Sequence, residues 1–159
     1  MDLRSFLDSL GDDLLEINEP VSVVHEMPAL QHELDRAGRF PVLRFLRPRL
    51  PGGEPSVIPV VNNLTASRVL TAKALGVADH RHCAAEFARR SAAAIQPSIV
   101  ERADAPVQQV VLQGEAADLT RLPVLTQHEL EPGPYLTAAH ATTFDPDTLT
   151  DNTAIQRCW

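Results

Sequence analysis

Cysteine is scarce in this sequence, which has only Cys83 and Cys158 among its 159 residues. Two cysteines far apart in the chain are too few for a disulfide scaffold and too widely separated for a local zinc knuckle. We therefore expect free, buried thiols, the ordinary state of cysteine in a reducing compartment.

Long apolar runs are also missing, because no stretch of 18 consecutive apolar residues occurs. The opening residues alternate charged and apolar side chains and lack the apolar centre of a signal peptide. These absences predict a chain with no membrane partner, and a cytoplasmic location is the default expectation.

Positive charge is in short supply: 14 Lys and Arg face 21 Asp and Glu, for a net charge of -7. This balance argues against a nucleic-acid-binding surface. Glycine is also sparse, with 7 Gly against 13 Pro. That ratio indicates rigid turns and short extended pieces in place of a bundle of long helices.

The first hundred residues mix helical and extended patterns, which predicts an α/β domain over residues 1–104. Apolar periodicity and capping residues predict helices over 2–10, 26–37, 65–75 and 79–94. Short apolar runs predict strands over 14–17, 42–46 and 57–61, the last interrupted by Pro59.

The pattern of residues changes from residue 105 onward, where patterns typical of extended structure dominate. We expect a strand over 107–112, a single turn over 118–121, and a hairpin of strands 135–144 and 152–159 closed by Asp145 and Pro146. An isolated hairpin is only marginally stable. Residues 105–159 are therefore expected to be the start of a second domain that is incomplete at Trp159.

Several histidines invite a functional interpretation that their spacing does not support. His80 and His82 precede Cys83, but residues two apart point to different sides of a helix. His128, in a polar loop, is a candidate acid or base, and His140 lies within an expected strand. The ordinary alternatives are a surface helix start for the first pair, a hydrogen-bonded surface group for His128 and a satisfied strand residue for His140.

The strongest candidates lie on the last expected strand. Asn152 offers a neutral oxygen to a hard cation such as Mn²⁺, Mg²⁺ or K⁺, and Arg157 offers a fixed fork to a phosphate or carboxylate, with Gln156 beside it. Ordinary polar strand positions are the alternative. Residues five apart point to opposite faces of a regular strand, so Asn152 and Arg157 share a ligand only if the strand is bulged or bent between them.

Six segments in chain order resemble the N-terminal part of the UbiD family of (de)carboxylases. They are MDLR with Phe6 and Leu7 (1–7), PVVNNL with Ser67 and Arg68 (59–68), DLTRLP (118–123), QHE through GPYLT (127–137), DPDT (145–148) and NTAIQR (152–157). The departures are Glu131 for a common Asp, Ala154 for Gly, Gln156 for an aromatic, and Cys158-Trp159 for Met-Gln.

This resemblance implies an N-terminal α/β domain followed by the first strands of a split β-barrel that binds prenylated FMN. It implies that Asn152 ligates a divalent metal, Mn²⁺ or Mg²⁺, with K⁺ as a further candidate cation. Ile155, Gln156 and Arg157 would contact the flavin, and Arg157 would also be catalytic within an Arg–Glu–Glu network. The implied reaction removes CO₂ from an unsaturated or aromatic carboxylic acid, with the cofactor carrying the difficult chemistry.

The resemblance also implies partners and missing parts. A flavin prenyltransferase would supply the cofactor, and the full-length protein is expected to form homo-oligomers. The other metal ligands, the proton donor and the C-terminal domain would lie beyond residue 159. The 159-residue chain alone is therefore expected to be inactive and to bind flavin weakly or not at all, because one ligand does not hold a cation.

Two alternatives stay open on the sequence alone. One is a split-barrel oxidoreductase that uses plain FMN, although such a barrel needs no metal-ligating Asn. The other is a non-catalytic α/β interaction module whose last hairpin pairs with another chain.

Overall fold

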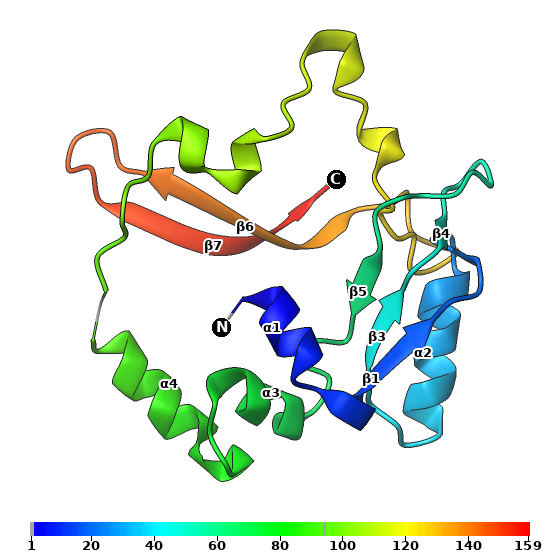
Figure 1. Ribbon diagram of the computed structural model, residues 1–159, viewed down its shortest axis with the longest axis horizontal. Coiled ribbons are helices and arrows are strands. Elements are labelled where there is room, and N and C mark those ends of the chain that lie inside the picture. Colours follow the sequence, from blue (N-terminus) through cyan, green and yellow to red (C-terminus); the bar gives the residue numbers. More distant parts are fainter. Residues whose placement is uncertain (1, 94) are drawn as a thin grey trace. The chain divides into compact units, whose positions relative to one another are not determined.

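The computed structural model describes residues 2–93 and 95–159 and shows a mixed α/β protein, as the sequence predicts (Figure 1). The described helices are α1 (Leu3–Asp8), α2 (Glu26–Arg36), α3 (Arg68–Leu75) and α4 (Cys83–Ser91). The described strands are β1 (Leu14–Ile17), β2 (Val21–Ser22), β3 (Val42–Phe45), β4 (Pro48–Arg49), β5 (Val60–Asn62), β6 (Leu136–Phe144) and β7 (Asp151–Cys158). None of these helices is long and apolar enough to cross a membrane.

The strands form small sheets. β1, β3 and β5 pair in the order β1-β3-β5, β2 pairs with β4, and β6 pairs with β7. By its contacts the chain divides into two compact units. The first comprises residues 1–15, 40–42 and 62–121, and the second comprises residues 16–39, 43–61 and 122–159.

The first unit is helical at its centre. α3 lies against α4, and Lys73 of α3 forms an ion pair with Asp13, with 2.5 Å between Nζ and Oδ2. The core of this unit is small. Its buried apolar side chains are Phe6, Leu7, Leu10, Val42, Leu70 and Ala72.

The second unit has the larger core. α2 packs beside β2, and β2 pairs in parallel with β4 through Val21 and Pro48. Thr126 joins this core from far along the chain: its amide donates to the carbonyl of Val23 at 3.1 Å, and its carbonyl accepts from the amide of His25 at 3.1 Å. The buried apolar residues of the unit are Ile17, Val23, Met27, Leu34, Leu43, Phe45 and Pro48.

The two cysteines are free, as expected, but the expectation that they are buried is wrong. Cys83 is half-buried and Cys158 is exposed.

The helix ends follow local sequence signals. The Asp2 side chain caps α1 by accepting from the amide of Ser5 at 2.9 Å. The Ser67 hydroxyl caps α3 by accepting from the amide of Leu70 at 3.1 Å, and Gly76 ends that helix at a φ of 67°. Glycine suits this position because the left-handed region strains residues that carry a Cβ.

Three boundary predictions need correction. The strand expected over 57–61 begins only at Val60, because Pro59 has no amide hydrogen to donate to a sheet. The helix expected from residue 65 begins at Arg68, after its Ser67 cap. The helix expected over 79–94 begins as a 3₁₀ turn, His80–His82, and its α-helical part ends at Ser91, whereas residue 94 lies outside the described residues.

The strand expected over 107–112 is wrong. Residues Pro106–Gln108 form a 3₁₀ turn, and residues 109–113 carry no regular structure. Val107 and Val110 are 80% and 75% exposed. A β run needs a neighbouring strand to pair its backbone groups, and the local pattern cannot supply one.

The hairpin of β6 and β7 matches the prediction and forms a two-stranded ribbon (Figure 1). Its turn is organised by Asp145, whose Oδ1 accepts from the amides of Asp147 at 2.9 Å and Thr148 at 2.7 Å. These bonds, the Thr148 amide foremost, lower the pKa of the Asp145 carboxyl. The turn also holds Leu149 at a φ of 55°, in the left-handed region.

Candidate functional site

The candidate residues all lie on β7. The pairing of β7 with β6 determines which face of the strand each side chain occupies. Phe144 pairs with Asp151, and the register runs without interruption to the pair of Ala139 and Gln156. Alternate residues of a strand share a face, so Asn152 and Gln156 lie on one face and Ile155 on the other. Regular pairing therefore places the predicted metal ligand on the same face as one predicted flavin contact, Gln156, and on the face opposite another, Ile155.

The hairpin has a bulge, but it lies in β6, opposite Arg157, and not in β7 between Asn152 and Arg157, where a ligand shared by these two residues requires one. Leu136 pairs with Cys158 and Ala139 with Gln156, so two residues of β6 oppose Arg157 alone. This is the two-against-one count of a β-bulge, which bends a strand and re-aims side chains. The interval from Asn152 to Gln156 is itself regular, so any change in the direction of Arg157 relative to Asn152 arises at the bulge opposite Arg157.

Arg157 lies over the ring of Tyr135, with 5.7 Å between its Cζ and the ring centroid. This separation falls within the range of a cation–π contact, about 6 Å. Arg157 is exposed and Tyr135 is half-buried. The contact joins the end of β7 to the Gly-Pro-Tyr corner that precedes β6.

Glu131 holds the other end of Tyr135. The tyrosine hydroxyl donates to Glu131 Oε1 at 2.8 Å, and Glu131 Oε2 accepts from the amides of Gln127 at 2.8 Å and His128 at 3.2 Å. The Tyr135 hydroxyl and then these two amides lower the pKa of the Glu131 carboxyl, so it is ionised at neutral pH.

Asn152 is exposed, and its side chain offers one neutral oxygen to a cation. Among residues 2–93 and 95–159, no group of three or more His, Cys, Asp or Glu side chains is arranged to hold a metal ion. On β7 the guanidinium of Arg157 suits a phosphate or carboxylate, and the exposed apolar side chain of Ile155 suits a flavin ring. The amide oxygen of Asn152 suits a hard cation.

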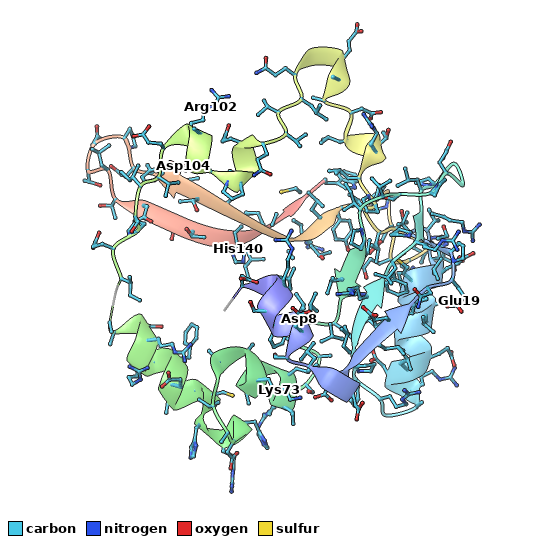
Figure 2. The ribbon with its side chains drawn as sticks, viewed as in Figure 1. Asp8, Glu19, Lys73, Arg102, Asp104 and His140 are labelled. Atoms are coloured by element: carbon cyan, nitrogen blue, oxygen red, sulfur yellow. The ribbon has the colours of Figure 1, made fainter. Side chains whose placement is uncertain are left out.

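His80, His82 and His128 take the ordinary roles. His80 and His82 are exposed at the 3₁₀ turn that precedes α4, as a surface helix start requires. His128 is an exposed hydrogen-bonded group whose Nδ1 accepts from the amide of Leu130 at 3.1 Å. His140 is exposed and projects from β6 (Figure 2).

A hollow of about 580 Å³ lies beside α2. His25, His32 and His128 line it together with Asp35 and Glu129. His25 has a φ of 64°, which is uncommon for a residue with a Cβ. None of these side chains except His128 was a candidate on the sequence, because the lining comes from segments about a hundred positions apart.

Sequence reasoning missed Tyr135 and Glu131 as partners of Arg157. The available signals were the single Tyr of the chain, placed after Gly-Pro, and a Glu four residues before it. Neither signal predicts a contact with a residue more than twenty positions away. That contact depends on the register of the hairpin.

Two family models match nearly the whole chain. The 3-octaprenyl-4-hydroxybenzoate carboxy-lyase N-terminal domain matches residues 7–90, and the 3-octaprenyl-4-hydroxybenzoate carboxy-lyase Rift-related domain matches residues 98–159. The chain belongs to the UbiD family, as its six motifs predict.

Curated relatives include two decarboxylases. An anhydromevalonate phosphate decarboxylase of Methanothermobacter thermautotrophicus is 29% identical over 98% of this chain and 33% of its own length. A pyrrole-2-carboxylic acid decarboxylase of Pseudomonas aeruginosa is 32% identical over 85% of this chain and 29% of its own length. The chain thus spans about a third of the length of these relatives.

Solved structures show the same fold. An evolved dimeric form of the UbiD-class enzyme HmfF from Pelotomaculum thermopropionicum, in complex with prFMN, matches with a TM-score of 0.84 at 29% identity, over 98% of this chain and 35% of that one. HmfF in complex with FMN matches with the same score over 33% of its chain. A 3,4-dihydroxybenzoic acid decarboxylase from Enterobacter cloacae, 23% identical with a TM-score of 0.83 over 98% of this chain and 34% of that one, supports the fold alone.

Proposed function

We propose that this chain is the N-terminal part of a prenylated-FMN-dependent decarboxylase that removes CO₂ from an unsaturated or aromatic carboxylic acid. In this proposal residues 1–104 form the N-terminal domain, and residues 105–159 begin a split β-barrel that binds the flavin. The observation that carries the proposal is the exposed strand β7, which presents Asn152, Ile155, Gln156 and Arg157 within the segment matched by the Rift-related domain.

Each β7 side chain has a role that suits its chemistry. Asn152 supplies a carbonyl oxygen to a divalent metal, Mn²⁺ or Mg²⁺, or to K⁺, beside the flavin phosphate. Ile155 and Gln156 contribute contacts with the flavin. Arg157 supplies a guanidinium that stays charged and stabilises the substrate carboxylate or the acidic groups beside it.

The bound cofactor would supply the electron-accepting chemistry that decarboxylation of an unsaturated acid requires. This chain would position the flavin and neutralise anionic charge near it. The remaining metal ligands and the proton donor belong to the part of the full-length protein that follows residue 159. A flavin prenyltransferase supplies the cofactor in this proposal, and the full-length protein is a homo-oligomer.

The experiment is to produce the full-length protein with and without a flavin prenyltransferase and to measure CO₂ release from a panel of unsaturated and aromatic acids in the presence of Mn²⁺. We expect turnover only after co-production with the prenyltransferase, and loss of turnover in Arg157→Ala. Arg102→Ala is the matched control, because Arg102 is exposed on a 3₁₀ turn outside the hairpin (Figure 2).

The same preparations separate the proposal from a flavoprotein that uses plain FMN. A relative, HmfF, has a solved structure in complex with FMN, and this observation motivates the plain-FMN alternative. Flavin spectra that are identical with and without the prenyltransferase, together with no CO₂ release, would favour the plain-FMN alternative. Loss of activity in Arg102→Ala as severe as in Arg157→Ala would remove the assignment of Arg157.

A further inference from the structure

Arg157 needs a fixed position if it is to serve a reacting carboxylate, and its exposure on β7 does not by itself provide one. A free arginine side chain samples many rotamers, and ordering it opposes binding. The ring of Tyr135 restricts this freedom, since the guanidinium carbon lies 5.7 Å from the ring centroid. The bulge in β6 lies opposite Arg157.

The tyrosine ring is itself held at its far end. Its hydroxyl donates to one oxygen of Glu131, and the other oxygen of Glu131 accepts two backbone amides, those of Gln127 and His128. Hydrogen bonds to a charged acceptor are stronger than those between neutral groups. Moving the ring away from Arg157 would therefore break the bond to Glu131.

Glu131 is tied in turn to the core of the second unit. The amides that it accepts directly follow Thr126, which pairs with the backbone of Val23 and His25. Val23 is fully buried. A continuous set of contacts thus runs from the buried strand region through Thr126 and Glu131 to Tyr135 and Arg157.

Trp159, the only tryptophan of the chain, lies at the same corner. Its indole Nε1 is 3.6 Å from the place where a Cβ on Gly133 would stand. Trp159 is 81% exposed and lies near Gly133, so the described contact between the Gly-Pro-Tyr corner and the end of β7 is that of Tyr135 with Arg157.

We propose that Tyr135, held by Glu131, is a positioning residue for Arg157: it fixes the guanidinium toward the anionic ligand of the β7 strand. The inference rests on the proposed function, in which that ligand is the flavin or the substrate carboxylate. Tyr135 acts through Arg157 and needs no contact with the reacting atoms.

The first test is spectroscopic and independent of activity. In NMR spectra of the protein, the side-chain protons of Arg157 should be shifted upfield by the tyrosine ring. The shift should vanish in Tyr135→Leu, survive in Tyr135→Phe, and weaken in Glu131→Gln, which keeps the ring but loses the charged acceptor. Arg157 protons at ordinary positions in the unaltered protein would overturn the inference.

The second test is kinetic, in the full-length enzyme loaded with its cofactor. Tyr135→Leu should lower kcat/KM by about two- to fivefold, the factor that matches a cation–π contact at an exposed site. Tyr135→Phe should restore most of this loss because the ring is retained. Phe144→Leu is the matched control, an aromatic residue 65% exposed at the other end of β6.

The two proposals fail in different ways. If Arg157→Ala is impaired but Tyr135→Leu equals the unaltered enzyme, the positioning role is wrong and the proposed function stands. If Arg157→Ala keeps full turnover while the upfield shift is present, the contact exists but the catalytic assignment of Arg157 fails, and the positioning role fails with it.

Discussion

At the scale of single residues, Glu131 is the most informative side chain of the candidate site. Its carboxylate is used on both oxygens, by the Tyr135 hydroxyl and by two backbone amides. The Tyr135 hydroxyl, and after it the amides of Gln127 and His128, lower the pKa of Glu131. A depressed carboxyl pKa means that the contacts favour the charged form.

The lowered pKa of Glu131 predicts how the contact between Glu131 and Tyr135 depends on pH. The pKa of Glu131 is lower in the folded protein than in the unfolded chain. The hydrogen bonds of the ionised carboxylate therefore stabilise the folded state above the ordinary glutamate pKa of about 4.3, and this stabilisation is lost as pH falls through the lowered pKa. The ring signals of Tyr135, the only tyrosine, should therefore stay constant from neutral pH down to about 4.3 and change only below it. An NMR titration measures this directly.

Glu131→Gln is the control for that titration, because its amide does not ionise and the ring signals should lose this transition. Circular dichroism over the same pH range shows that the chain remains folded. A midpoint at or above about 4.3 in the unaltered protein would contradict the hydrogen bonding described for Glu131.

At the scale of elements, local capping explains where α1 begins and where α3 begins and ends. The side-chain oxygens of Asp2 and Ser67 satisfy amides that a helix leaves free at its start, and Gly76 ends α3 in the left-handed region. The sequence shows these residues directly, and so the elements that they bound were predictable. The strand expected over 107–112 failed for the opposite reason, because a strand depends on a partner that no local pattern specifies.

The α3 cap makes a prediction about stability. Ser67→Ala should lower the free energy of unfolding by about 1 kcal/mol, because it removes the acceptor for the Leu70 amide. Ser98→Ala, at an exposed position outside any helix or strand, should change it by no more than about 0.5 kcal/mol. Chemical denaturation of both variants provides the measurement, and equal effects would refute the capping role.

A substitution in the hairpin turn is expected to raise stability, in contrast to the loss expected for Ser67→Ala. Leu149 has a φ of 55° and is 75% exposed, so its side chain adds strain and little packing. Leu149→Gly should therefore stabilise the hairpin, by up to about 1 kcal/mol, and slow amide hydrogen exchange in β6 and β7. Thr150→Gly, at a residue outside the left-handed region, should speed exchange instead. Faster exchange in Leu149→Gly would show that the turn is not strained.

At the scale of the whole molecule, stability should depend on the second unit. Phe45 is fully buried in β3, whereas Phe87 of α4 is 66% exposed. Phe45→Ala should cost about 3–5 kcal/mol of unfolding free energy, and Phe87→Ala should cost far less. Thermal or chemical unfolding of the pair tests this difference. Similar losses in both variants would contradict the assignment of the core.

The family and the fold class were both predictable, because the ordered motifs and the helix-capping residues are local signals in the sequence. The site was predictable only in part. The sequence indicated Asn152 and Arg157 by residue chemistry. It also indicated that these two residues can share a ligand only if the strand is bulged or bent between them. The place of that bulge, and the Glu131–Tyr135–Arg157 contacts, depend on hairpin register and on the pairing of Thr126 with Val23. Such long-range pairings follow from the packed structure and not from local patterns.

The central claim is that β7 holds the phosphate end of a prenylated flavin through Asn152 and its metal. The most direct measurement is the flavin and metal content of the purified full-length protein, produced with a flavin prenyltransferase, by mass spectrometry and elemental analysis. We predict stoichiometric prenylated FMN and divalent metal in the unaltered protein and in Arg102→Ala, and loss of both in Asn152→Ala. Unaltered protein without flavin, or Asn152→Ala with full flavin and metal content, would contradict the account.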